Sequence, residues 1–171
     1  MHIALKPWTD DLKPDLIRIC NSVERTYLSN RLPQPYTEES ADFWLNIIRQ
    51  QEGTDSISRA VVAGGRAVGN ITIERRTDVY GQDAEIGYLL ETDSQGKGIM
   101  TEATRQICDL AFTTLEIIRI TAKVCVPNIA SCRVLEKNGF QQEGLIRQGF
   151  VKNGNIYDYK IFGKLLEGIE K

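Results

Sequence analysis

The sequence contains very little of the chemistry that metal sites and charge-relay catalysis require. Its 171 residues include one histidine, His2, so an internal Ser-His-Asp triad and a His-metal cluster both lack their imidazoles. The cysteines, Cys20, Cys108, Cys125 and Cys132, show no two-residue spacing. Because that spacing marks structural metal sites, we expect no metal, and we expect free thiols in a reducing compartment.

The sequence also lacks a long apolar run and an excess of charge of either sign. Hydrophobic residues make up 42%, and 21 Lys and Arg face 23 Asp and Glu, a net charge of −2. No run approaches the roughly 18 apolar residues of a membrane helix, and a near-neutral chain has no long-range attraction to nucleic acid or an anionic membrane. We therefore expect neither partner. The N-terminus shows no secretory signal, which predicts a cytoplasmic location.

The pattern of apolar and polar residues predicts an α/β chain in a single domain, residues 1–171. The expected order is strand, two helices, three strands, helix, strand, helix and two strands, which favours a mixed sheet over regular βαβ alternation. The predicted strands include 3–6, 56–63, 67–74, 84–90 and 117–126, and the predicted helices include 11–29 and 130–137. Tight turns are predicted at Gly64-Gly65 and Asn153-Gly154.

A glycine-rich turn between a strand and a helix is the sharpest local feature. The strand over 84–90 leads into Gly96-Lys97-Gly98, and the helix follows directly. Two glycines let a ligand approach the backbone, and the unpaired N–H groups of a first helical turn attract an anion such as a phosphate. Lys97 can add a mobile positive charge. An ordinary loop with a glycine cap is the alternative at this point.

Two known nucleotide-binding patterns do not match this turn. An ATPase phosphate loop needs an earlier glycine at a fixed distance and then Gly-Lys-Ser/Thr, yet Lys97 is followed by Gly98. A dinucleotide fingerprint needs three spaced glycines and an acidic residue about 20 positions further on. Neither spacing is present, so both classes of nucleotide-binding protein are disfavoured.

Two motifs together resemble the GNAT superfamily of N-acetyltransferases. The first, Gln95-Gly96-Lys97-Gly98-Ile99-Met100, is similar to the family's acetyl-CoA signature, with Met100 departing at its last position. The second runs from Asn128 to Phe140 and reads Asn-Ile-Ala-Ser-Cys-Arg-Val-Leu-Glu-Lys-Asn-Gly-Phe. With Leu32-Pro33, Pro35-Tyr36 and the strand Glu85-Ile86-Gly87-Tyr88, they resemble the RimJ/RimL-like branch of ribosomal-protein N-terminal acetyltransferases.

The resemblance implies a single-domain GNAT-like fold, in which a mixed, mostly antiparallel twisted sheet of about seven strands is flanked by about four helices. It implies acetyl-CoA as cosubstrate without a metal, a peptide N-terminus or small amine as partner, and a homodimer as an open possibility. The residues it places on the coenzyme are the backbone of Tyr88, Leu89 and Leu90 along the pantetheine arm, the N–H groups of Gln95, Gly96, Lys97, Gly98, Ile99 and Met100 on the pyrophosphate, and Asn128, Ser131 and Arg133.

Three of these coenzyme residues have separate roles in the resemblance. It places Asn128 on the pantetheine side, Ser131 near the thioester sulfur and Arg133 near the adenosine end. For Asn128, a role as the N-cap of the helix that starts there is an equal alternative.

Direct acetyl transfer needs a neutral amine, a donor to the oxyanion and a proton for the departing thiolate. An N-terminal amine with a pKa of about 7.7–8.0 is already partly neutral at physiological pH, whereas a lysine side chain with a pKa of about 10.4 is almost fully protonated. With no histidine positioned to help, Glu85 is the candidate base, and an ion-paired surface carboxylate is its alternative. Backbone N–H groups of Tyr88 to Leu90 would hold the oxyanion. The resemblance implies that Ser131 supplies the proton; a hydroxyl bonded to its own backbone is the alternative.

Other side chains are candidates for the same chemistry. Tyr36, Tyr88 and Tyr157 are rivals to Ser131 as acids, although aromatic residues more often line a core or a substrate groove. Acceptor contacts are expected from Tyr36, Glu85 and Asp158, where Asp158 has the alternative of stabilising the closing hairpin. A covalent acyl-Cys132 is disfavoured, because no histidine is available to form the thiolate.

The function expected first is acetyl transfer from acetyl-CoA to a primary amine, above all the α-amine of a protein N-terminus. A second hypothesis keeps the chemistry and changes the acceptor to a polyamine, an amino acid or an aminoglycoside. A third is a non-catalytic acyl-CoA-binding module, which would bind the coenzyme and release no thiol. The loops around 30–37, 76–83 and 147–155, which should shape the acceptor groove, contain no pattern that identifies the acceptor.

Overall fold

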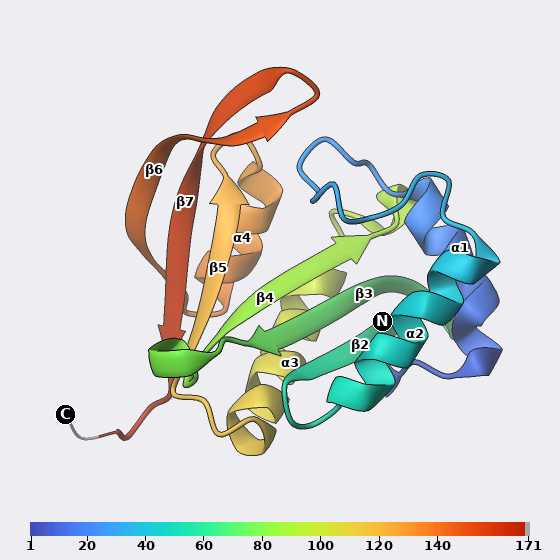
Figure 1. Cartoon of the computed structure of the whole chain (residues 1–171), viewed down its shortest axis with the longest axis horizontal. Helices are drawn as coiled ribbons and strands as arrows, with labels where there is room; N and C mark the ends of the chain where they lie inside the picture. The colour runs from blue at the N-terminus through green and yellow to red at the C-terminus, as the bar shows by residue number, and fades with distance from the viewer. Residues whose placement is uncertain (170–171) are drawn as a thin grey trace.

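In residues 1–169, which the computed structural model describes, seven strands form one mixed sheet and four α-helices cover its two faces (Figure 1). The strand order is β1-β2-β3-β4-β5-β7-β6, in which β4 and β5 run parallel and the other neighbours antiparallel. This arrangement confirms the α/β fold and the element order predicted from the sequence. The strands are β1 (Ile3–Pro7), β2 (Ser56–Ala63), β3 (Arg66–Arg75), β4 (Asp83–Leu90), β5 (Arg119–Cys125), β6 (Gln141–Lys152) and β7 (Asn155–Leu165). The α-helices are α1 (Lys13–Ser22), α2 (Glu38–Gln51), α3 (Ile99–Thr114) and α4 (Ile129–Lys137), and short 3-10 turns span Asp10–Leu12, Asp78–Tyr80 and Thr92–Ser94.

Two hydrophobic cores hold the helices to opposite faces of the sheet. The larger core lies under α3 and α4 and includes the fully buried Ile71, Ile107 and Phe162. The smaller core lies under α1 and α2 and includes Leu16 and Leu45. Burying one such aliphatic or aromatic side chain stabilises a fold by roughly 1.5–3 kcal/mol, so both layers are firmly attached to the strands that carry the site.

Local sequence signals explain several boundaries. Thr37 and Ser40 form a reciprocal capping box at the start of α2, which satisfies two N–H groups that the first helical turn leaves free. The turn between β2 and β3 has Gly64 at φ +59° and Gly65 at φ +83°. Two consecutive positive φ angles favour a two-residue hairpin with the natural strand twist. The predicted turn at this dipeptide is therefore confirmed.

The first helix is shorter than the predicted helix over 11–29. α1 ends at Ser22, and Val23 adopts an extended conformation with φ −76° and ψ 147°. The Arg25 guanidinium donates to the carbonyl oxygen of Cys20 at 2.8 Å, which satisfies one of the carbonyls that a helix end leaves without a partner. The predicted C-terminal end was wrong, because apolar residues at helical spacing continue into a loop whose side chains face a cavity.

Candidate functional site

The sheet opens between its two parallel strands. β4 and β5 pair only over Asp83–Glu85 and Arg119–Thr121, and the two strands then diverge as a wedge (Figure 1). A cavity of about 980 Å³ occupies this wedge. The inner edge of β4 from Ile86 to Leu90 has no paired strand on the β5 side, so its backbone groups are available to an extended ligand.

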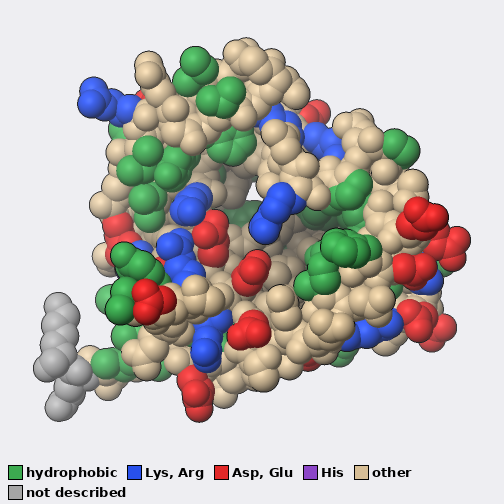
Figure 2. Space-filling view, viewed as in Figure 1, with side chains coloured by type: hydrophobic (Ala, Val, Ile, Leu, Met, Phe, Trp, Pro, Cys, Tyr) green, Lys and Arg blue, Asp and Glu red, His purple; other side chains and the backbone are tan. Residues whose placement is uncertain are grey.

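The cavity is open on the face of the molecule shown in Figure 2, where a hollow is bordered by both basic and acidic side chains. Its walls come from β3, β4 and β5, from α4, from the β6–β7 hairpin, and from the loop between α1 and α2. Segments distant in the sequence therefore meet around one space. A volume near the upper end of ordinary ligand pockets suits a substrate larger than a single metabolite.

The glycine-rich turn follows β4 and leads into α3, outside the lining of this cavity. Lys97 and Gly98 line a smaller hollow beside Met1, His2 and Ile3. Gly96 has φ +73° and Gly98 has φ +75°, a left-handed conformation that favours glycine. A Cβ atom at either position would meet nothing within 4 Å, so the space above the turn is open. Gly98 provides no side-chain cap to α3, and the first N–H groups of the helix are left to attract an anion. The turn thus has the features of a phosphate cradle.

Side chains of this turn are engaged within the protein, which leaves its backbone N–H groups as the candidate contacts to an anion. Ile99 and Met100 are 3% and 6% exposed and pack in the larger core. Lys97 Nζ donates to the carbonyl oxygen of Asp93 at 2.7 Å, and Gln95 Nε2 donates to that of Leu90 at 3.4 Å. The ammonium of Lys97 is thus tied to the turn itself, in place of the mobile charge expected from the sequence.

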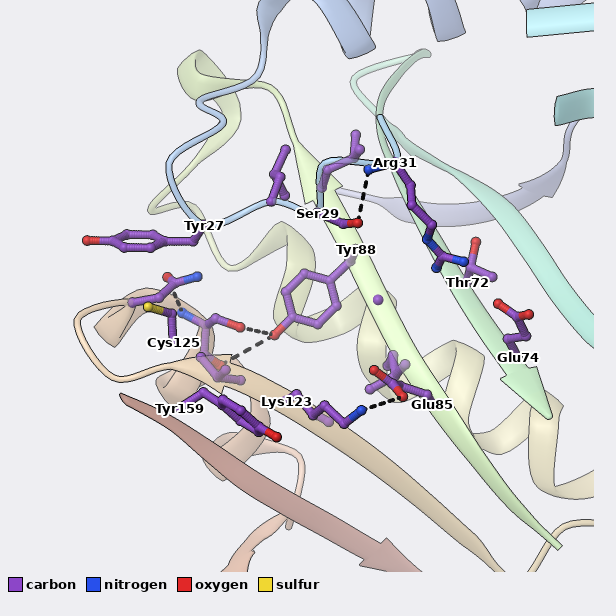
Figure 3. Close-up of a pocket in the computed structure, with 18 of the residues that line it drawn as sticks. Tyr27, Ser29, Arg31, Thr72, Glu74, Glu85, Tyr88, Lys123, Cys125 and Tyr159 are labelled. Atoms are coloured by element: carbon purple, nitrogen blue, oxygen red, sulfur yellow. Dashed lines mark hydrogen bonds and ion pairs between the residues drawn. The ribbon is translucent and has the colours of Figure 1, made fainter. Parts of the chain in front are cut away.

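Tyr88 and Ser131 meet across the wedge, one from β4 and the other from α4. Figure 3 shows the Tyr88 ring pointing from β4 into the cavity. The Tyr88 hydroxyl lies 2.7 Å from Ser131 Oγ, and either oxygen can be the donor. Burial raises the pKa of Tyr88 to about 12, although the hydrogen bond to Ser131 opposes that shift. The phenol therefore stays protonated at physiological pH and can pass a proton through Ser131.

Asn128 and Arg133 occupy different positions on α4. The Asn128 side chain accepts a hydrogen bond from the Ser131 backbone N–H at 3.3 Å, which is the N-cap arrangement weighed from the sequence. Asn128 also lines the cavity, so the cap does not remove it from reach of a ligand. Arg133 is exposed on α4 and lies outside the cavity lining.

Glu85 lines the cavity from β4 and is held by cations on two sides. Its carboxylate lies 3.2 Å from Arg76 Nη2 and 3.5 Å from Lys123 Nζ. The side chain is 42% exposed, so these ion pairs are screened by water. Glu85 is therefore the ion-paired carboxylate weighed from the sequence, and because it also lines the cavity it stays a candidate base.

Tyr36 and Asp158 are not among the cavity-lining residues, contrary to the acceptor contacts expected of them. Tyr36 is 5% exposed and belongs to the smaller core. Asn21 forms hydrogen bonds to both its backbone N–H and its carbonyl oxygen. Asp158 accepts the Gln148 backbone N–H at 2.8 Å and so stabilises an irregular part of the β6–β7 hairpin. In the folded chain, both side chains therefore make contacts that stabilise the structure.

Three polar residues on β3 were missed from the sequence. Asn70, Thr72 and Glu74 line the cavity and alternate with the fully buried Ile71 and Ile73. Successive side chains of a strand point to opposite faces, so the alternation places the three polar groups on one face, beside Glu85 on the next strand. The alternation was visible in the sequence. What could not be read there is which of the two faces opens to a cavity.

Cys125 lines the cavity, whereas Cys20, Cys108 and Cys132 lie outside its lining. The four cysteines are free and buried, and burial raises the pKa of the Cys132 thiol, which works against a covalent acyl-cysteine. Within residues 1–169, no group of three or more metal-ligating side chains is close enough to hold an ion. None of the helices in that range is long and apolar enough to cross a membrane.

Comparison with known proteins gives one family match. The model of the acetyltransferase (GNAT) domain matches residues 2–141. A probable N-acetyltransferase of Bacillus subtilis, YjcK, is 41% identical over 100 residues, which are 58% of this chain and 55% of the relative. A putative ribosomal N-acetyltransferase of the same organism, YdaF, is 33% identical over 117 residues, 68% of this chain and 63% of the relative. The chain thus spans little more than half the length of these relatives.

Solved structures show the same fold over nearly the whole chain. RimL, a ribosomal L7/L12 alpha-N-protein acetyltransferase in complex with coenzyme A, superposes with a TM-score of 0.83. The match covers 98% of this chain and 96% of that one, at 19% sequence identity. An identity this low supports a shared fold and no more.

Proposed function

Because the chain belongs to the family of acetyltransferase (GNAT) domains, we propose that it transfers the acetyl group of acetyl-CoA directly to the α-amine of a protein N-terminus. The observation that carries this proposal is the wedge between β4 and β5, where an open strand edge and the Tyr88–Ser131 hydrogen bond lie in one cavity. The glycine turn follows β4 along the chain and lies outside the lining of that cavity. RimL and YdaF bear names that point to ribosomal proteins, which agrees with an acceptor of this class.

The free edge of β4 and the turn after it fit an extended ligand with a phosphorylated end. Peptide-like amides of a pantetheine arm can pair with the backbone of Tyr88, Leu89 and Leu90 as an added strand would. A pyrophosphate can lie on the N–H groups from Gln95 to Met100, at the positive end of α3. Acetyl-CoA supplies an acyl group that is already activated as a thioester.

The remaining steps fall to this chain's own groups. Backbone N–H groups of β4 that face the wedge are placed to stabilise an oxyanion. Tyr88 and Ser131 provide a proton path toward the departing thiolate, whose pKa of about 8.5 makes the demand modest. Glu85 lies on the cavity wall where it can accept a proton from the incoming amine through water.

An N-terminal α-amine is the acceptor that needs the weakest base in such a site. Its pKa of about 7.7–8.0 leaves a useful neutral fraction at physiological pH, whereas a lysine at about 10.4 needs a strong base. His2 lines no part of the cavity, so no imidazole among the described residues supplies that base. The cavity is also open at the surface, which lets a chain end enter.

Two further proposals concern the whole chain. The first is a single domain over residues 1–171. It is supported within the described residues 1–169, where β6 and β7 extend past the matched residues 2–141 and yet continue the same sheet beside β5. A cytoplasmic location is consistent with four free cysteines.

A thiol-release assay tests the proposed function. Acetyl-CoA is offered with unblocked peptides, polyamines, amino acids and aminoglycosides, and coenzyme A release is measured for each. We expect release with peptides, and none with the same peptides after N-terminal acetylation. Release only with small amines would transfer the proposal to that acceptor class. Acetyl-CoA binding without release for any amine would leave a non-catalytic binding module.

A further inference from the structure

The loop between α1 and α2, residues 23–37, forms one wall of the cavity and is firmly anchored. Asn21 bonds both backbone groups of Tyr36, at 2.8 and 2.9 Å. Arg25 donates to the carbonyl oxygens of Cys20, Leu32 and Pro33 at 2.8 to 3.0 Å. The loop therefore needs little further ordering when a ligand binds, which lowers the entropic cost of a contact made from it.

The same loop is also tied to the β6–β7 hairpin on the other side of the cavity. Lys152, 9% exposed, donates from Nζ to Leu28 O at 2.8 Å and to Asn30 Oδ1 at 2.9 Å. The rings of Tyr27 and Tyr157 meet edge to face at 6.1 Å. The loop is thus a fixed bridge across one end of the wedge. Its own Arg25 and the hairpin's Lys152 are both already used for structure.

Arg31 is a cationic residue of this loop whose guanidinium makes no structural contact among the described residues. Its side chain is exposed and descends from the loop toward Thr72 and Glu74 on β3 (Figure 3). Among residues 1–169, its guanidinium has no hydrogen-bond or ion-pair partner; only its backbone N–H is bonded, to Ser29 Oγ. A planar guanidinium with free donors on a fixed loop suits a carboxylate, which it can bind through two parallel hydrogen bonds.

The charges around Arg31 favour an acceptor that carries both signs. The described cavity lining has three cationic side chains on this side, Arg31, Arg76 and Lys123, and two anionic ones, Glu74 and Glu85. The guanidinium of Arg75 donates instead to the carbonyl oxygen of Leu115 at 3.4 Å. Arg76 and Lys123 both pair with Glu85. Glu74 lies directly opposite Glu85 in the β3–β4 register, so carboxylates gather on the strands while an unused guanidinium lies above them.

We propose that Arg31 is a specificity-determining residue that binds a carboxylate of the acceptor, an acidic side chain close behind the N-terminal amine of a peptide. This inference rests on the proposed function. The amine of such an acceptor faces Glu74 and Glu85, while its acidic side chain reaches the guanidinium on the loop. A polyamine would bring a second ammonium against Arg31 and an excess of cationic lining, so the same charges disfavour it.

Matched peptides test the inference. One series has an N-terminal serine, no lysine, and aspartate at the second, third or fourth residue, and each peptide has a counterpart with asparagine there. For at least one position we expect kcat/KM to be about two- to fivefold higher with aspartate, since an exposed charge pair is of that strength. The ratio should fall as salt is raised, and the difference should lie in KM.

Variants then assign the preference to Arg31. In Arg31→Gln the ratio should fall to one through loss on the aspartate peptide alone, and Arg31→Lys should keep part of it. Arg147→Gln is the matched control, because Arg147 is exposed on β6 and lies outside the cavity lining. Equal rates for both peptides in the wild type, or an unchanged ratio in Arg31→Gln, would overturn the inference while peptide acetylation itself stands.

Failure of the proposed function gives a different result. If the wild type acetylates none of the peptides but does acetylate small amines, the N-terminal assignment is lost. The inference is then decided with free aspartate against free asparagine as acceptors. A higher rate for aspartate that disappears in Arg31→Gln supports the carboxylate site, and equal rates for the two amino acids overturn it.

Discussion

Tyr88 and Ser131 are joined by one hydrogen bond of 2.7 Å, and we expect them to have different roles as proton donors. The Ser131 hydroxyl stands at the first turn of α4, within reach of the wedge. The Tyr88 phenol is kept protonated by burial, and so it can restore a proton that Ser131 gives up. The serine is therefore the group expected to meet the leaving sulfur, with the tyrosine behind it.

Replacing Ser131 by alanine should lower turnover and spare coenzyme binding. We expect kcat to fall by about 10²-fold, the lower end for loss of a positioned proton donor, with the Kd for coenzyme A unchanged. The N-cap survives, because Asn128 bonds the backbone N–H of residue 131 and not its hydroxyl. Stopped-flow or steady-state kinetics and calorimetry measure the two quantities.

Ser22→Ala provides the control for that experiment. The Ser22 hydroxyl bonds the Ile19 carbonyl oxygen within α1 at 3.1 Å and lies outside the cavity lining, so kinetics should be unaffected. Equal losses of turnover and of coenzyme affinity in Ser131→Ala would make Ser131 a binding residue and would contradict the proton path.

The pH profile should rise and then level off. Turnover should increase through the acceptor amine's pKa of about 7.7–8.0, because the neutral amine is the nucleophile. Burial disfavours the phenolate and raises the pKa of Tyr88 to about 12, so the phenol keeps its proton and no decline should appear up to about pH 10. A descending limb below pH 10 that vanishes in Tyr88→Phe would contradict the protonated phenol.

Glu85→Gln should alter the rising limb of the pH profile, because this variant removes the candidate base. A rising limb identical to that of the wild type would remove Glu85 as the base.

At the level of secondary-structure elements, coenzyme A affinity should depend on the charge of the residue in the turn before α3. Gly98→Asp places a carboxylate where the first N–H groups of the helix attract an anion, so coenzyme A affinity should fall by about 10²-fold or more. Gly98→Asn is the matched control: both residues tolerate the left-handed conformation at φ +75° better than other side chains do. Calorimetry with coenzyme A compares them, and equal affinity in the two variants would contradict the pyrophosphate assignment.

Most element types could be predicted because local signals agreed with the fold. The glycine pair after β2, the cap at Thr37 and the glycine turn before α3 each specify a backbone conformation that the structure adopts. The end of α1 could not be predicted in this way. Its termination depends on Arg25 reaching back to Cys20 and forward to Leu32 and Pro33, a set of contacts that only the folded loop assembles.

The residues of the candidate site also divide into those that local signals predict and those that depend on tertiary packing. Motif residues that act through the backbone, such as Gly96 and Gly98, could be predicted because their conformation is local. Tyr36 could not, because its burial under α1 and α2 is a tertiary fact. Arg31 and Lys123 likewise come to the cavity from segments with no motif, and the alternation along β3 does not say which face opens.

At the scale of the whole molecule, the sheet works as two halves joined along a short parallel pairing. β3 and β4 line one wall of the cavity with the loop between α1 and α2, and β5, α4 and the β6–β7 hairpin line the opposite wall. The three residue pairs between β4 and β5 leave the rest of the wedge free for a ligand strand. Scarcity of histidine then fits the chemistry, because an activated thioester and an N-terminal amine need only backbone donors and a modest proton path.

Acetyl transfer in this wedge should go to an N-terminal α-amine. One peptide with a free N-terminus and an internal lysine is incubated with enzyme and acetyl-CoA, and the modified nitrogen is located by fragment-ion mass spectrometry. We expect acetylation of the α-amine and an unmodified lysine. Acetylation of the lysine, or an unmodified peptide under conditions in which a polyamine is acetylated, would contradict the N-terminal assignment.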